Sequence, residues 1–596
     1  MAKHHNLTLG DRARIVPPHV GQNVLPNLPF FEKLVRFAHR NPPRIAIRDL
    51  NAGVEKSYLE LLTDAIALRR ALRSSLSPST QNRLENDQEV FIAHLAPGGY
   101  EYAVGFVAIL ALGAAVVPIS PALPPAEARS LITRAECVAL LSSTSTTSLA
   151  NSITTSLHAA TQIPSPHIEI LPHLHKPPLP PPTLLISSSP VPNMNIASLI
   201  IFTSGTTGPP KAAVQRRSYI VSAAEDVADQ YRLSENDTVL HMLPVHHATG
   251  IGITFLPFLV SGACVEFRSG GFDAAWTWER FRRNADNRTG FGNGTGPGNG
   301  KGKANGEITV FSGVPTMYIR LMRFFESHIL PLPEAEREEY ISSARAIRVF
   351  LCGTSALPGP VQDFWKGILG GRSILTRFGG TEFHAVIKAG MDGAAPVNSV
   401  GVVSPGVDVK LDGEGMVLVR GPNLFSKYLN DEVATKAAHD AEGYFITGDI
   451  ARREGEDYHI LGRASIDIIK SGGYKISALD IEREILGLEY VSEVMVVGVE
   501  DEEYGQRVAA AVTLKDEYRA KGGKLSIDQL RGDLRGVLAG YKMPTLLRVL
   551  EEEIPKSATG KVQKRILGPK FFPRDYGGLK EVQVWEKGKG GVEAKL

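Results

Sequence analysis

One loop decides how this chain is interpreted: Thr203-Ser204-Gly205-Thr206-Thr207-Gly208-Pro209-Pro210-Lys211. The apolar run at residues 199–202 before it predicts a buried strand. Glycines let the backbone direct successive N–H groups at an anion, hydroxyls add donors, and Lys211 adds a cation. A Walker A loop needs Gly-Lys-Ser/Thr at the start of a helix, whereas prolines precede the lysine here. The loop therefore predicts a polyphosphate site of another kind, although alone it could be a surface turn of small polar residues.

Four segments further along the chain favour a binding site over a surface turn. They are residues 377–382, 444–449, 462–473 and 555–561. In the first two, Phe378 can cover a nucleobase, Glu382 can hold Mg²⁺, and Asp449 can accept the hydroxyls of a ribose. The third segment is rich in small residues, as a hinge is. The fourth places Lys561 in a flexible loop, from which a cation can reach a reacting carboxylate.

In this order and spacing, the five segments resemble the adenylate-forming family of acyl-CoA synthetases, luciferases and peptide-synthetase adenylation domains. The resemblance runs from about Phe30 to about Leu567, and residues 314–318 and 467–475 look most like the malonyl-CoA synthetase branch. It implies an α/β fold whose large N-terminal domain consists of layered α/β subdomains and a small β-barrel-like part. A small mobile C-terminal α+β domain is expected to follow.

The pattern along the chain agrees with several domains, because 596 residues exceed what one core can hold. We predict an N-terminal domain over 1–462, a C-terminal domain over 463–570 and a tail over 571–596. A proline-rich connection at 163–195 and a glycine-rich, disordered insertion near 284–306 interrupt the large domain. A buried helix is expected to end near Gly113, with a strand after it. The small domain is expected to contain helices at 478–486 and from Ser526 to Leu538, and strands at 491–499, 508–514 and 546–550.

Composition sets further bounds on function. The net charge of +2 predicts no strong attraction to nucleic acid or an anionic membrane, and 43% of the residues are hydrophobic. The longest apolar stretch, 104–117, is shorter than the roughly 20 residues that span a bilayer, so we expect no membrane span. Cys137, Cys264 and Cys352 are far apart, which favours reduced, buried thiols over a disulfide frame or metal cluster.

The resemblance implies an ATP-dependent acid–CoA ligase, which uses ATP, Mg²⁺ and CoA and activates a small carboxylic acid. Malonate or a related small dicarboxylic acid is the favoured substrate, and a fatty-acid or aryl-acid CoA ligase is the alternative. A nucleotide-hydrolysing switch would need a Walker A loop, which the sequence lacks. A catalytically dead ATP-binding protein is disfavoured because Lys561, Glu382 and Asp449 are all retained.

The resemblance also implies a role for each site residue. The nucleotide-binding residues are Thr203, Ser204, Gly205, Thr206, Thr207, Gly208, Lys211, Gly353, Thr354, Ser355, Ala356, Phe378, Gly379, Thr381, Glu382, Asp449 and Arg463. His247 and Arg320 would bind the acid, and Ser471, Gly472 and Gly473 would bind CoA. Glu382 and Thr206 are the expected Mg²⁺ ligands, and together with Lys561 they form the catalytic set.

Some of these assignments have competing interpretations. Arg463 could form a structural ion pair, and Arg320 could be a surface arginine whose stem lies along apolar neighbours. Lys561 taken alone would be an ordinary solvated lysine. The sequence departs from the family pattern at three positions: Phe378 stands where most relatives carry tyrosine, Arg377 where malonyl-specific relatives usually carry glutamate, and Thr249 where the malonate branch usually carries histidine.

The two ends of the sequence bear on location. The final residues Ala594-Lys595-Leu596 are similar to the Ser-Lys-Leu signal that the peroxisomal import receptor reads, so we expect that receptor as a partner. The alternative is a chance tripeptide on a protein of the cytoplasm or the mitochondrion. The first residues have no apolar core of a signal peptide and no clear Arg-rich amphipathic pattern.

Overall fold

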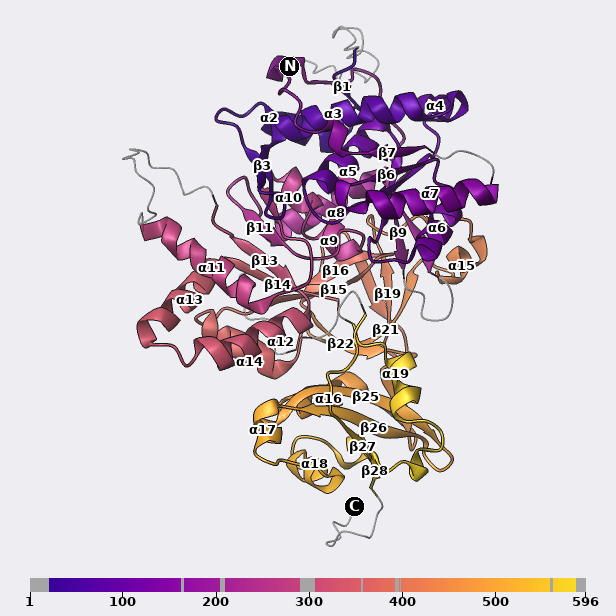
Figure 1. Ribbon diagram of the computed structural model, residues 1–596. Helices are drawn as coiled ribbons and strands as arrows, with labels where there is room; N and C mark the ends of the chain where they lie inside the picture. Colours follow the sequence, from indigo (N-terminus) through magenta and orange to yellow (C-terminus); the bar gives the residue numbers. More distant parts are fainter. Residues whose placement is uncertain are drawn as a thin grey trace, which may run out of the picture.

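The computed structural model describes residues 21–161, 166–203, 210–289, 306–354, 357–391, 396, 398–557 and 561–585. Figure 1 shows a large domain, coloured indigo to orange, and a small yellow domain beneath it that ends near the C-terminus. The structure confirms the predicted α/β class with a large N-terminal and a small C-terminal domain. The predicted boundary after Gly462 stays a prediction. Among the described residues, no helix is long and apolar enough to cross a membrane.

The first large sheet contains β9 and β10, the two strands on either side of the loop at residues 203–211. Its seven strands, in spatial order, are β20 (Lys427–Tyr428), β10 (Lys211–Arg216), β9 (Ala197–Thr203), β5 (Ala115–Ile119), β4 (Phe91–Leu95), β6 (Ala139–Ser142) and β7 (His167–Glu169). β4 and β5 are parallel and buried at every position, as central strands of an α/β sheet are. α5 (Tyr100–Leu112) ends at Gly113, whose φ is +89°, and β5 follows, which confirms the predicted order.

The second large sheet has nine strands. They are β17 (Val402–Val403), β16 (His384–Lys388), β15 (Leu375–Gly380), β14 (Val349–Cys352), β13 (Val310–Gly313), β11 (Thr238–His241), β12 (Cys264–Phe267), β2 (Ile45–Asp49) and β3 (Val54–Ser57). One face packs against α11 (Ala274–Thr289), α12 (Pro315–Phe324) and α14 (Gly359–Ile368), where Trp278 and Trp365 stack at 5.6 Å. Pro315 opens α12, as its fixed φ favours.

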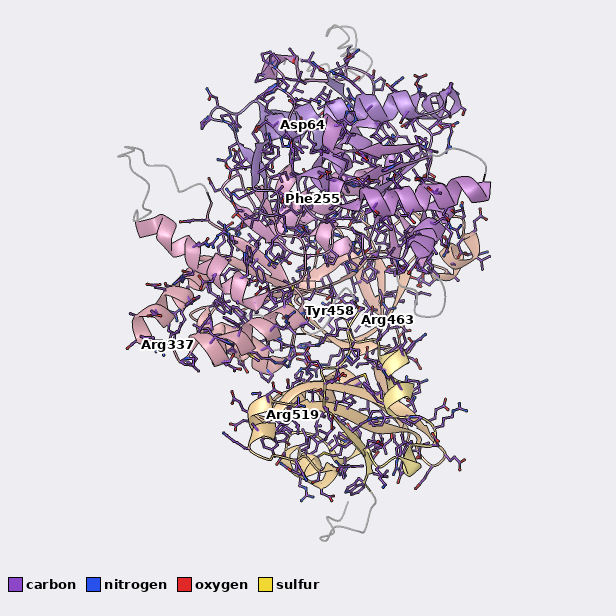
Figure 2. All side chains as sticks on the ribbon, in the orientation of Figure 1. Asp64, Phe255, Arg337, Tyr458, Arg463 and Arg519 are labelled. Carbon is purple, nitrogen blue, oxygen red and sulfur yellow. The ribbon has the colours of Figure 1, made fainter. Side chains whose placement is uncertain are left out.

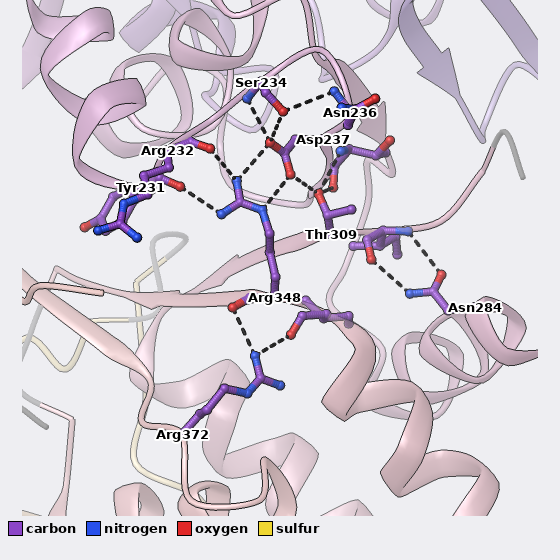
Figure 3. A network of polar contacts seen from close by, with 12 residues as sticks. Tyr231, Arg232, Ser234, Asn236, Asp237, Asn284, Thr309, Arg348 and Arg372 are labelled. Carbon is purple, nitrogen blue, oxygen red and sulfur yellow. Dashed lines mark hydrogen bonds and ion pairs between the residues drawn. The ribbon is translucent and has the colours of Figure 1, made fainter. Parts of the chain in front are cut away.

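A polar network pins the amino ends of three neighbouring strands of this sheet (Figure 3). Asp237, Thr309 and Arg348 each stand directly before β11, β13 and β14. The Arg348 guanidinium donates to both Asp237 oxygens at 2.7 and 2.8 Å, and the Thr309 hydroxyl donates to Asp237 at 2.7 Å. With the amino ends fixed here, the carboxyl ends of these parallel strands lie together at the opposite edge of the sheet.

The first residues of the segment predicted to be a disordered insertion, near 284–306, are helical. α11 continues to Thr289, and Asn284 within it is fully buried. Its side-chain amide donates to the Ile308 carbonyl at 3.0 Å, and its oxygen accepts from the Ile308 N–H at 3.1 Å. Asn284 therefore ties the chain on both sides of the insertion together, and residues 290–305 lie outside the described ranges.

A third, antiparallel sheet links the large domain to the small one. Its strands are β18 (Asp408–Leu411), β19 (Met416–Arg420), β21 (Phe445–Glu454) and β22 (Asp457–Arg463). The remaining elements of the large domain are β1 (Val24–Leu25), β8 (Leu185–Ile186), α2 (Pro29–Ala38), α3 (Tyr58–Ser75), α4 (Pro78–Glu85), α6 (Pro125–Arg134), α7 (Thr147–Thr161), α8 (Arg217–Gln230), α9 (Ala248–Gly252), α10 (Leu256–Val260), α13 (Glu334–Ala346) and α15 (Glu432–Ala437).

The small domain consists of a hairpin and a four-stranded sheet with helices. Its elements are β23 (Ile468–Ser471), β24 (Tyr474–Ser477), α16 (Ala478–Leu486), β25 (Val491–Asp501), β26 (Gly505–Leu514), α17 (Asp516–Ala520), α18 (Ile527–Asp533), β27 (Leu546–Leu550), α19 (Lys564–Phe571) and β28 (Val582–Val584). α16 and β27 have the predicted bounds. The helix predicted to reach Leu538 was too long, because α18 ends at Asp533 and Gly536 turns the chain with a φ of +98°.

Candidate functional site

The segment predicted to bind phosphate lies between two antiparallel strands, β9 and β10. Thr203 ends β9 and faces Lys211, the first residue of β10, so Lys211 belongs to a strand and not to the predicted loop. The Lys211 ammonium lies 4.8 Å from the centre of the Tyr428 ring. The residues between them that were assigned to the nucleotide, Ser204, Gly205, Thr206, Thr207 and Gly208, lie outside the described residues.

Glu382 is held close to this hairpin by Tyr428, a residue that sequence reasoning missed. The Tyr428 hydroxyl donates to a Glu382 carboxylate oxygen at 2.8 Å, and burial beside that carboxylate raises the tyrosine's pKa. The carbonyl of Thr381 accepts from the buried Gln215 amide at 2.6 Å. β10 and β20 therefore fix the end of the 377–382 motif next to the hairpin formed by β9 and β10. Nothing in the short polar context of Tyr428 signals this role in the sequence.

Most of the 377–382 motif belongs to β15, which runs from Leu375 to Gly380. Phe378 is buried and packs on Phe383 at 5.5 Å, inside an apolar cluster. A Cβ on Gly379 would come within 2.1 Å of the His384 carbonyl oxygen, so only glycine fits there. Gly353 follows β14 and lies against the Arg377 guanidinium. A Cβ added to Gly353 would lie 3.1 Å from the guanidinium carbon of Arg377.

The predicted nucleotide-binding segment at residues 353–356 is described only in part. Thr354 follows Gly353 with a φ of +76°, a conformation that non-glycine residues rarely adopt. Ser355 and Ala356 lie outside the described residues.

Asp449 and Arg463 face each other as paired residues of β21 and β22. Arg463 Nε lies 3.2 Å from one Asp449 oxygen and Nη2 lies 3.5 Å from the other. Burial raises the pKa of Asp449, while the positive charges of Arg463 and, to a smaller extent, Lys561 act to lower it. The ion pair considered as the alternative role of Arg463 is therefore present, at the boundary between the two domains (Figure 2).

Lys561 reaches this boundary from the small domain. The residue is exposed, yet desolvation around its ammonium lowers its pKa, as does Arg463, while Asp449 acts in the opposite sense. Its backbone closes the loop on Ser557, whose N–H donates to the Lys561 carbonyl at 2.8 Å. Lys561 also lies close enough to His247 to lower that residue's pKa. Lys561 therefore influences electrostatically both the residue assigned to the ribose, Asp449, and the residue assigned to the acid, His247.

His247 caps the start of α9. Its pKa falls to about 4, first through burial, then through Lys561 and His246, so the ring is neutral at pH 7. Nδ1 accepts the Thr249 N–H and lies 2.7 Å from the Thr249 hydroxyl, an arrangement that assigns the ring proton to Nε2. Thr249, where the malonate branch usually carries histidine, thereby fixes the tautomer of His247.

The other assigned residues lie on α12 of the large domain and on the β23–β24 hairpin of the small domain. Arg320 is exposed on α12, and its guanidinium lies 5.3 Å from the centre of the Phe272 ring. Ser471, Gly472 and Gly473 form the turn between β23 and β24, with both glycines at positive φ. The Gly472 N–H donates to the Tyr504 carbonyl, within the small domain, at 2.9 Å.

Two family profiles match this chain. Residues 34–284 and 304–429 match the AMP-binding enzyme family. The chain belongs to that family. Residues 480–561 match the AMP-binding enzyme C-terminal domain, which ends at Lys561. This AMP-binding enzyme is an adenylate-forming acid–CoA ligase, and the substrates ATP and CoA with Mg²⁺ are those of its family.

Relatives of this AMP-binding enzyme include malonate–CoA ligases and an acyl-CoA ligase. The mitochondrial malonate–CoA ligase ACSF3 of Bos taurus is 34% identical over 411 residues, which are 64% of this chain and 65% of that protein. The same enzyme of Xenopus laevis is 30% identical over 87% of this chain and 88% of its own length. The acyl-CoA ligase oryP of Aspergillus oryzae is 32% identical over 92% of this chain and 94% of its own length.

Solved structures share the fold. ATP-bound MatB from Rhodopseudomonas palustris superposes with a TM-score of 0.72 at 24% identity, covering 93% of this chain and 99% of that one. A malonyl-CoA ligase in a ternary product complex with methylmalonyl-CoA and AMP has a TM-score of 0.57 at 27% identity, covering 88% of this chain and 100% of that one.

Proposed function

We propose that this acid–CoA ligase activates malonate or a related small dicarboxylic acid. The observation that carries the two-step chemistry is Lys561, which comes from the small domain and lies within electrostatic reach of Asp449 and His247. The choice of acid is supported by relatives named malonate–CoA ligases and by Arg320 on α12.

The first half-reaction makes a mixed anhydride. A carboxylate oxygen of the acid attacks the α-phosphorus of ATP, the bond to the oxygen shared with the β-phosphate breaks, and pyrophosphate leaves. Negative charge builds on the oxygens of the α-phosphate, so a fixed cation in a desolvated site stabilises the transition state most. Lys561 is the residue that we assign to this role, and Asp449 accepts the ribose hydroxyls.

Mg²⁺ would be held by Glu382 together with Thr206. The fit of Glu382 is good, because Mg²⁺ in nucleotide sites takes one or two carboxylates and fills its other positions with phosphate oxygens and water. Tyr428 orients that carboxylate through a hydrogen bond to one of its oxygens. Among the described residues there is no cluster of three His, Cys, Asp or Glu side chains that would suit a transition metal instead. When bound, Mg²⁺ neutralises charge on the phosphates.

The second half-reaction makes the thioester. The sulfur of CoA attacks the acyl carbonyl carbon, the thiol proton passes to water, and the C–O bond to AMP breaks so that AMP leaves. We assign the turn at Ser471, Gly472 and Gly473 to the pantetheine arm, because glycines at positive φ let a thin chain approach the backbone. This requires the small domain to rotate, with Lys561 leaving the site.

A pyrophosphate-release assay across a panel of acids tests the proposal. Malonate should give the highest kcat/KM. The acyl-adenylate formed with pyrophosphate release should be converted to a thioester only when CoA is present. A fatty-acid or aryl-acid CoA ligase is the second candidate, favoured by Thr249 in place of the histidine typical of the malonate branch. It becomes the better description if long-chain or aromatic acids exceed malonate in kcat/KM.

We also propose import into peroxisomes through Ala594-Lys595-Leu596, which lies outside the described residues. Relatives whose names include the word mitochondrial support the mitochondrion as the alternative. A fluorescent protein fused to the N-terminus should collect in peroxisomes, and removal of the three residues should leave it diffuse. Collection in mitochondria, with or without those residues, would support the alternative.

A further inference from the structure

Arg323 crosses from the large domain to the small one. It lies in the last turn of α12, three residues after Arg320, and a quarter of its side chain (26%) is exposed. Its guanidinium donates to the Ser492 carbonyl and lies 3.7 Å from the Glu553 carboxylate. Both partners belong to the small domain, and in Figure 1 α12 lies on the side of the large domain that faces it.

The two partners of Arg323 flank the base of the loop that carries Lys561. Glu493, next to Ser492, accepts the backbone N–H of Ile554 at 2.7 Å, and Ile554 is next to Glu553. The same carboxylate, only 12% exposed, also accepts from the Lys556 ammonium at 2.5 Å.

Lys556 in turn starts the Lys561 loop. It bridges to Val562 across the loop, and Ser557 is hydrogen bonded to Lys561. A continuous set of contacts therefore runs from Arg323 through Glu493 and Lys556 to the loop that ends at Lys561.

We propose that Arg323 is a positioning residue for the adenylation half-reaction: it fixes the Lys561 loop against α12. The proposal rests on the function proposed above. Because Arg320 lies one turn earlier on α12, one rigid helix would set the places of both the acid and the catalytic cation. Arg323 and Ser492 come from different domains, so their contact is lost when the small domain rotates for thioester formation.

The hydrogen bond from Arg323 to Ser492 contributes more to the orientation of the small domain than the ion pair with Glu553 does. The pairing with Glu553, which is 70% exposed, is worth little because water and salt screen it. A guanidinium hydrogen bond to a backbone carbonyl is directional and charge-assisted, so it specifies an orientation. The pair Glu414–Lys475 also joins the domains, at 3.0 Å, but both side chains are more than half exposed. It supplies a matched control.

The test compares Arg323→Ala, Arg323→Lys and the control Glu414→Ala with the wild type. Acid-dependent pyrophosphate release without CoA measures the first half-reaction, and thioester formation from supplied acyl-adenylate measures the second. Arg323→Ala should slow the first about tenfold, with the KM for ATP and acid within about twofold, and leave the second unchanged. Arg323→Lys should restore part of the loss, and Glu414→Ala should match the wild type in both.

A pH profile separates positioning from a general structural defect. If the loop no longer holds Lys561 in its desolvated place, the alkaline limit of pyrophosphate release should move to higher pH in Arg323→Ala. Equal loss of both half-reactions, an unmoved profile, or the same loss in Glu414→Ala would each overturn the role of Arg323. If none of the acids tested supports pyrophosphate release by the wild type, the proposed function is wrong, and the role of Arg323 with it.

Discussion

The role proposed for Lys561 depends on the positive charge of its ammonium group. Because desolvation and Arg463 lower the pKa of Lys561, it loses its proton at lower pH than an ordinary lysine, which titrates near pH 10.4. Pyrophosphate release should therefore decline as pH rises through that lowered pKa, and Lys561→Arg should keep its residual activity constant across the same range. Stopped-flow measurement of the first half-reaction from pH 6 to pH 10.5 checks this. A wild-type rate that stays flat to pH 10.5 would contradict it.

If Arg320 binds the second carboxylate of malonate, it determines the preference of the enzyme for dicarboxylic over monocarboxylic acids. A carboxylate in the acyl pocket needs a charged partner to offset its desolvation, so Arg320→Met should lower kcat/KM for malonate by roughly 30-fold, or about 2 kcal/mol. Butyrate should lose little, and ATP binding should not change. Steady-state kinetics with both acids make the comparison. A parallel fall for both acids would show that Arg320, which contacts Phe272 here, is structural.

Tyr428 offers a test of the Glu382 assignment. Tyr428→Phe keeps the ring beneath Lys211 but removes the hydrogen bond to Glu382. Such a bond contributes about 1 kcal/mol, so the Mg²⁺ concentration for half-maximal pyrophosphate release should rise about fivefold. Tyr428→Leu, which also removes the cation–π contact, should raise the KM for ATP as well. An unchanged Mg²⁺ dependence in Tyr428→Phe would remove Glu382 from the metal site.

Among the elements, the pinned amino ends of β11, β13 and β14 matter most for stability. Asp237→Ala would leave Arg348 without its carboxylate and should destabilise the large domain by about 3 kcal/mol. Glu85→Ala, which breaks the exposed pair with Arg73, should cost less than about 0.5 kcal/mol. Thermal denaturation of both variants measures the difference. Equal midpoints would show that the network contributes nothing.

The same network has a defined pH dependence. Burial alone would raise the pKa of Asp237, but hydrogen bonds from Arg348 and Thr309 lower it overall. Its stabilisation is therefore complete above the unfolded carboxyl pKa of about 3.9, and it is lost as pH falls through the lower folded-state value. The gap in melting temperature between wild type and Asp237→Ala should be constant from pH 5 to 8 and should narrow below pH 4.

Local elements could be predicted where sequence and packing agree. α5, β5, α16 and β27 have strong apolar patterns and clear boundary residues, and they form as predicted. α18 was predicted too long because its apolar pattern continues past Asp533, while the backbone already turns at Gly536. Tyr428 was missed because its role depends on β10 and β20 pairing, which joins residues more than 200 positions apart.

At the scale of the whole molecule, the two half-reactions should separate. Lys561→Ala should slow adenylation at least a hundredfold, the loss typical of a transition-state cation, and leave thioester formation from supplied adenylate largely intact. Quenched-flow assays of each half-reaction measure this. Equal losses would contradict a rotation that removes Lys561 from the site. No sequence pattern predicts the orientation seen here, because Lys561 and Asp449 meet only through the packing of one domain on the other.

The three cysteines have a practical consequence for watching that rotation. All are free, and burial raises the pKa of each thiol, to about 12 for Cys264 and Cys352. At pH 7 they are therefore protonated and react slowly with maleimides, since only the thiolate is nucleophilic. One cysteine introduced on each domain, at exposed Glu414 and exposed Arg574, would take up paired fluorophores with little background labelling. Single-molecule fluorescence energy transfer could then follow one enzyme through successive turnovers, and the three native cysteines would not need to be replaced.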